Sequence, residues 1–326
     1  MAIIKSRRIV TREKGKRFKY SEGPVPSSSM LSGVKKCFIL GALPYSQENY
    51  DNVRLVLSQL HLEDVKPTYS ADLKMDLYLI GRNAGACRHN CVLGDGTTPW
   101  IKPCELLSVG DAKMWHQRFL EEAGGKGTGI NHQNMVHEIL LQYPDETLLI
   151  DILNIPELHV MLGVTAKLYE YIKLASSTEW AMSVLTALNI TPTNHNQVKG
   201  LNGNSCKKLL ENATLFIVKS KSLPDSCDKV RIVAAAKTMS LFNAVVDSCF
   251  GVLVEGDWVE AIRAFCASYR ALPGISFPPK YHLVEGHIQQ FLERRWQQDC
   301  YKGCGLGYWS EQSFEVWVNI LQNKHH

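Results

Sequence analysis

The stretch K-Y-H-L-V-E-G-H, residues 280–287, lies near the end of this 326-residue chain and decides how the rest is interpreted. It places His282 and His287 five residues apart. Five residues of α-helix turn through about 500°, so the two rings are expected to diverge by about 140° unless one lies at a helix end. The pair is interpreted either as metal ligands or as ordinary core or surface histidines.

A second stretch, G-Y-W-S-E-Q-S-F-E at residues 307–315, follows a connector that contains glycine and cysteine. Ser310 is a candidate N-cap, and apolar residues after it recur at helical spacing. Glu311 and Glu315 would then share one helix face. Two such carboxylates can hold a hard divalent cation if a further carboxylate faces them. The alternative interpretation is a solvated helix edge.

Residues 70–91 read S-A-D-L-K-M-D-L-Y-L-I-G-R-N-A-G-A-C-R-H-N-C. Asp72 follows a candidate strand at residues 65–71, and apolar residues at helical spacing follow it. A carboxylate between a strand end and a helix is a frequent position for a metal-binding acid. Cys87 and Cys91 complete the stretch.

The order of these features resembles one family. An acid, a cysteine pair, a long helical stretch, a histidine pair and a terminal acid are typical of the RNase H-fold DDE recombinases of the Transib transposase type. This family includes the catalytic subunit of the V(D)J recombinase. The similarity covers roughly residues 34–319 and includes L-H-V-M-L-G-V at residues 158–164 and L-N-G-N-S-C-K-K-L-L at residues 201–210.

The resemblance implies two metal sites. Asp72 matches the family's second catalytic acid and Glu315 its last, which bind Mg²⁺ or Mn²⁺ in active members. One structural Zn²⁺ is implied at the cysteine and histidine pairs, which are here Cys87, Cys91, His282 and His287.

Two departures from the family pattern bear on function. The family's cysteine pair is C-x-x-C, whereas Cys87 and Cys91 have three residues between them and Gly94 stands at the family's spacing after Cys91. The family's first acid lies further before the second than the 71 residues that precede Asp72. We therefore expect an amino-terminally truncated, transposase-derived protein without DNA-cleaving activity. The alternatives are an active or conditionally active recombinase and a host-adapted protein- or nucleic-acid-binding module.

Composition places the chain among ordinary globular proteins, with 45% apolar and 21% charged residues. It predicts no membrane-spanning segment and no signal peptide, so a nuclear or cytoplasmic protein is expected, not a secreted one. The ten cysteines are therefore expected to be free thiols. Cys249 and Cys266 fall on apolar helix faces and are predicted core residues. Cys300 and Cys304 are predicted in a surface loop, with replacement zinc ligands as the alternative.

Charge is concentrated at the amino terminus. Residues 1–20 hold eight Lys or Arg and one Glu, a net +7, whereas the other 306 residues carry 28 basic and 31 acidic groups, a net −3. Only this basic segment is typical of nucleic-acid binding or nuclear import, so DNA is a candidate partner through it. An arm without a partner is the alternative. A homo-oligomer is left open.

The fold class that we predict is an α/β remnant of an RNase H-like sheet with a large, mainly α-helical insertion, and it is predominantly helical overall. Residues 1–32 form a basic flexible arm, 33–92 the partial RNase H-like segment, 93–308 the helical insertion, and 309–326 the helix with the last acid. Strands are predicted at residues 34–43 and 65–71. The main helices are predicted at residues 111–122, 156–174, 180–188, 206–211, 228–250 and 257–269.

Overall fold

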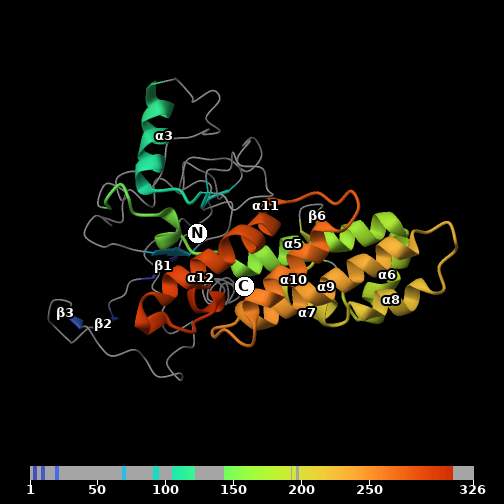
Figure 1. Cartoon of the computed structure of the whole chain (residues 1–326). Coiled ribbons are helices and arrows are strands. Elements are labelled where there is room, and N and C mark those ends of the chain that lie inside the picture. Colours follow the sequence, from blue (N-terminus) through green and yellow to red (C-terminus); the bar gives the residue numbers. More distant parts are fainter. Residues whose placement is uncertain are drawn as a thin grey trace, which may run out of the picture. The chain divides into compact units, whose positions relative to one another are not determined.

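The computed structural model describes residues 91–94, 105–121, 143–191 and 200–310 with their side chains. It also describes the backbone of three-residue strands, which are β1 (Ile3–Lys5), β2 (Ile9–Thr11), β3 (Lys19–Ser21), β4 (Thr68–Ser70), β5 (Thr193–His195) and β6 (Val198–Gly200). The described part is mainly helical, as predicted (Figure 1). The chain forms two compact units, one of Glu157–Leu292 with Gly303–Gly307 and one of the remaining residues.

The first of these, the helical unit, contains most of the helices. In chain order they are α5 (Glu157–Ala175), α6 (Thr178–Ala187), α7 (Gly203–Glu211), α8 (Thr214–Ser220), α9 (Lys229–Cys249), α10 (Trp258–Arg270), α11 (Pro279–His282) and the π-helical turn η5 (Leu283–His287). Helix α12 (Ile288–Trp296) begins in this unit. Five of the predicted helices coincide with α5, α6, α7, α9 and α10 to within a few residues.

Helix α9 is the centre of the helical unit and packs against α5, α7, α8 and α10 (Figure 1). Asp228 caps it by accepting a hydrogen bond from the Arg231 amide at 3.0 Å. An 18-residue window of this 21-residue helix has a mean hydropathy of 1.2, which meets the length and composition of a membrane span, and half of that window is buried inside the protein. Because four neighbouring helices bury α9, its apolar composition is that of a core helix.

Aromatic rings fill the space between α9, α10 and α11. The Phe265 ring lies 4.8 Å from the Phe242 ring and 5.9 Å from the Tyr281 ring, measured between centroids. Tyr269 stacks on Tyr281 with centroids 4.1 Å apart. These four side chains are fully buried, and the π-helical turn η5 contacts α10 and α11, which carry three of them.

Gly305 and Gly307 lie where the backbone of residues 305–307 closely approaches that of residues 249–253, which leaves no room for a side chain. The Gly305 amide donates to the Val252 carbonyl at 2.9 Å, and the Gly307 amide donates to the Gly251 carbonyl at 3.0 Å. A Cβ atom on Gly305 would meet the carbonyl oxygens of Gly251 and Cys249. Side chains at these positions would therefore push the two segments apart.

The other unit contains α3 (Val109–Glu121), which confirms the helix predicted at residues 111–122, and the 3₁₀ turn η4 (Leu149–Asp151). Arg294 of α12 donates hydrogen bonds to both carboxylate oxygens of Asp151, from Nε at 2.9 Å and from Nη2 at 2.6 Å. Arg295 is buried and donates to Asn154 Oδ1 at 2.9 Å. This pair of arginines fixes the carboxyl-terminal half of α12 to η4.

The described strands form three two-stranded antiparallel ladders, β1–β4, β2–β3 and β5–β6. Strand β4 lies within the strand predicted at residues 65–71, and β1, β2 and β3 fall in residues 1–32, for which a flexible arm was predicted. These ladders do not display an RNase H-like sheet. The strand predicted at residues 34–43 lies outside the described residues, so the sheet remnant stays a prediction.

Candidate metal centre

The backbone between the two histidines departs from an α-helix. Residues 283–287 form a π-helical turn, and the Ile288 amide donates to the carbonyl of Leu283, five residues earlier. In such a turn the backbone hydrogen bond joins residues five apart, so residues five apart lie closer to the same side than they do in an α-helix. The divergence of about 140° expected from α-helical geometry is therefore wrong for this pair, because the backbone widens where the histidines stand.

His282 and His287 converge as a result. Their Nε2 atoms lie 3.2 Å apart, and the two rings are nearly perpendicular with centroids separated by 4.9 Å. Both side chains are buried, His287 completely. Gly286 leaves room for this arrangement, since a Cβ atom there would lie 3.3 Å from Cε1 of His282.

Gln290 determines which His287 nitrogen is available for a metal. Its side-chain oxygen lies 2.9 Å from His287 Nδ1. An amide oxygen only accepts hydrogen bonds, so His287 Nδ1 carries the proton and Nε2 keeps its lone pair. This hydrogen bond from the second ring nitrogen is the arrangement that orients histidine ligands in metal sites.

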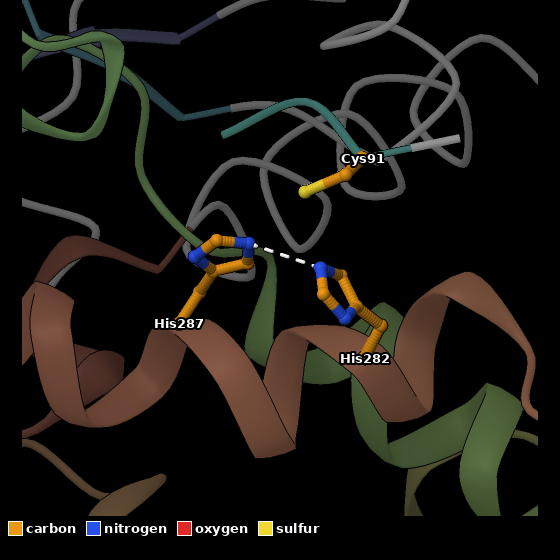
Figure 2. Close-up of side chains that lie close together, drawn as sticks. All are labelled: Cys91, His282 and His287. Atoms are coloured by element: carbon orange, nitrogen blue, oxygen red, sulfur yellow. Dashed lines mark hydrogen bonds between the residues drawn. The ribbon is translucent and has the colours of Figure 1, made fainter. Parts of the chain in front are cut away.

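Cys91 is the third member of the cluster. Its Sγ atom and the ligand nitrogens of His282 and His287 all lie within 4.8 Å of one another, and the three residues are buried. Figure 2 shows the thiol and both rings directed toward a common point. The segment that carries Cys91 is fixed by a hydrogen bond of 2.9 Å from the Leu107 amide to the Leu93 carbonyl.

The cluster suits a tetrahedral metal. Ligand atoms around Zn²⁺ with Zn–N near 2.0 Å and Zn–S near 2.3 Å are separated by about 3.3–3.6 Å. The two Nε2 atoms, 3.2 Å apart, are already close to this separation. A group of Cys91, His282 and His287 can therefore bind a metal ion.

The remaining predicted ligands are not placed by the structure. Asp72, Cys87 and Glu315 lie outside the described residues, so the catalytic pair and the fourth zinc ligand stay predictions. The prediction from sequence missed Gln290 and the π-helical turn. A glutamine three residues after a candidate histidine ligand was the signal in the sequence that could have indicated the former.

The other cysteines of the described part do not join the cluster. Cys249 and Cys266 are buried core residues, as predicted. Cys300 is exposed, which agrees with a surface loop, but Cys304 is buried, so the surface prediction is wrong for it. Its burial follows from the close approach of residues 303–307 to residues 251–254.

We expect the buried thiols to be inert toward disulfide reagents. Burial raises the pKa of Cys206, Cys249 and Cys266 to about 12. At pH 8 about one in ten thousand such thiols is ionised, and the thiolate is the reactive form. Ellman's reagent on the native chain, with modified positions mapped by mass spectrometry, should label Cys300 long before these three. Rapid labelling of Cys249 would contradict the burial.

The same shifts make stability depend on pH. The folded-state pKa of these three thiols exceeds that of an unfolded cysteine, which is near 8.5. The stability that the folded chain gains from keeping these thiols protonated is therefore fully present below pH 8.5. It is lost as pH rises from about 8.5 toward 12, which adds to alkaline unfolding.

No protein-family model and no curated protein matches this chain.

Proposed function

We propose that Cys91, His282 and His287 hold one structural Zn²⁺, with Cys87 as the fourth ligand. The observation that carries the proposal is the convergence of the three described side chains, with His287 held by Gln290 in the tautomer that binds metal. A buried thiol and two imidazoles are the donors that Zn²⁺ prefers, whereas Mg²⁺ and Ca²⁺ take oxygen ligands.

The ligand spacing supports a closed site. Structural zinc sites commonly pair C-x₂₋₄-C with H-x₃₋₅-H. Cys87 and Cys91 have three residues between them, and His282 and His287 have four, so both pairs fall inside these limits. A site with four protein ligands has no open position for substrate, which makes the zinc structural rather than catalytic.

Metal analysis tests this proposal. The full chain, purified without added metal, should contain about one zinc per chain by elemental analysis, and Co²⁺ exchanged into it should give thiolate-to-metal charge-transfer absorption. Cys87→Ser and Cys91→Ser should each weaken that absorption. A folded wild-type chain that takes up neither Zn²⁺ nor Co²⁺ would overturn the proposal.

We further propose that this zinc centre belongs to a transposase-derived protein that does not cleave DNA. The support is the order of the sequence motifs, together with a cluster of cysteine and histidines of the kind that the resemblance implies. Two-metal strand cleavage needs carboxylates around both cations, and only Asp72 and Glu315 are matched in this sequence. The finer fold, an RNase H-like sheet remnant, belongs to the same proposal.

A plasmid-nicking assay with Mg²⁺ or Mn²⁺ tests the second proposal. We expect no nicked or joined product from the wild-type chain. Nicking that disappears in Asp72→Asn would show instead a working carboxylate site and an active recombinase. Salt-dependent DNA binding without cleavage, lost when residues 1–20 are deleted, would assign DNA binding to the basic segment.

A further inference from the structure

The π-helical turn η5 requires an explanation because such turns are rare and this one aligns two ligands. Continuing α11 as an α-helix through residues 283–287 would restore ordinary hydrogen bonding and separate the histidine rings. Contacts from outside the turn must therefore favour the wider geometry. Those contacts come from within the helical unit.

Glu285, in the middle of η5, makes two of these contacts through one carboxylate oxygen. Its Oε1 accepts a hydrogen bond from Arg270 Nε at 2.5 Å and another from the Tyr281 hydroxyl at 3.0 Å. Arg270 is the last residue of α10 and Tyr281 belongs to α11, so three elements meet at this carboxylate. The hydrogen bond with Glu285 raises the pKa of Arg270 above its usual value.

Tyr281 is itself immobilised. Its ring is fully buried and stacks on Tyr269 with a centroid separation of 4.1 Å, and its hydroxyl lies 3.4 Å from the Cys266 carbonyl oxygen. The Glu285 side chain is only 15% exposed, so Arg270 is the cation that compensates a largely desolvated carboxylate. Side-chain contacts thus hold residue 281, immediately before His282, and residue 285, two positions before His287.

We propose that Arg270, Glu285 and Tyr281 form a positioning cluster that keeps the turn π-helical and thereby sets the metal affinity of His282 and His287. This inference rests on the proposed zinc centre. The cluster touches no metal. It acts through the backbone of η5, as groups around metal ligands commonly do when they fix ligand direction.

The test is the Zn²⁺ affinity of the full-length Arg270→Met variant, measured by competition with a chromogenic chelator. Changes around metal ligands typically cost about ten- to hundredfold in affinity, and we expect a loss in that range. Co²⁺ absorption should also change in intensity, because the two imidazoles no longer hold their directions. Arg270→Lys, which keeps the charge, should recover part of the affinity.

Arg263→Met is the matched control. Arg263 lies on the same helix and pairs with Glu260, but that ion pair is exposed, with 70% and 57% of the side chains accessible. We expect its Zn²⁺ affinity to equal that of wild type. Glu285→Gln, which keeps the shape of the side chain, provides a second variant if Arg270→Met does not fold. Combined with Arg270→Met it should add little further loss, because both changes remove one interaction.

The outcomes separate this inference from the proposal on which it rests. A wild-type chain that binds no metal overturns the zinc centre and the positioning cluster together. A wild-type chain that binds Zn²⁺ while Arg270→Met and Glu285→Gln bind it equally well overturns the positioning cluster alone. An equal loss in Arg263→Met would also overturn it, since a general effect of lost charge would then explain the result.

Discussion

His287→Ala is expected to lower Zn²⁺ affinity by at least about a hundredfold, more than changes to groups around metal ligands usually do. The substitution removes one of three convergent donors from a buried cluster. It also leaves the His282 Nε2 without its neighbour at 3.2 Å and the Gln290 side-chain oxygen without its donor at 2.9 Å. With Cys87 as the proposed fourth ligand, two thiols and one imidazole would remain, and three ligands do not complete the tetrahedral set of a structural zinc site.

The loss should appear in stability as well as in binding. A metal that binds only the folded chain stabilises it by mass action. Adding a chelator should therefore lower the melting temperature of the wild-type chain and leave that of His287→Ala unchanged. Differential scanning calorimetry with and without chelator measures both effects.

His116→Ala is the matched control for this experiment. His116 is a buried histidine of α3, 3% exposed, and it is not part of the cluster. Its removal should reduce packing but preserve one zinc per chain and the response to chelator. If His287→Ala retained zinc as well as His116→Ala does, His287 would be a core histidine and the metal centre would have to be abandoned.

The helices could be predicted from the sequence because their signals are local. Asp228 and Asp257 stand immediately before α9 and α10, and each caps its helix by accepting an amide hydrogen bond at 3.0 Å. Helix α8 was not predicted, because these local signals are absent from its sequence. It has only seven residues, and Ala213 at its start offers no side-chain cap, so neither periodicity nor capping marks it.

The metal centre could be predicted only in part. His282, His287 and Cys91 were identified as candidates through the resemblance, whereas the spacing of the histidines alone argued against convergence. The π-helical turn depends on Arg270, fifteen residues before Glu285, and no local pattern contains a contact of that range. The positions of Asp72, Cys87 and Glu315 stay predictions, since they lie outside the described residues.

Phe265→Ala is expected to destabilise the chain by about 3–5 kcal/mol, the usual cost of removing a buried phenylalanine ring. Phe265 is fully buried, and its ring centroid lies within 6 Å of those of Phe242, Tyr269 and Tyr281. Those neighbours cannot close the gap, because Tyr269 is fixed by its hydrogen bond to the Ser276 carbonyl at 3.0 Å. Urea unfolding of the zinc-loaded chain, followed by circular dichroism, measures the change.

Phe277→Ala separates the effect of burial from that of losing an aromatic contact. Phe277 also lies against Tyr269 and Tyr281, at centroid distances of 6.0 and 5.5 Å, but 39% of the residue is exposed. Water replaces its ring, so we expect a loss of about 1 kcal/mol or less. Because Tyr281 rests on Phe265 and holds Glu285, Phe265→Ala should also weaken Zn²⁺ binding, whereas Phe277→Ala should not. If the two substitutions destabilised the chain equally, the loss would come from the aromatic contacts that both rings make. The burial of Phe265 would then not be its cause.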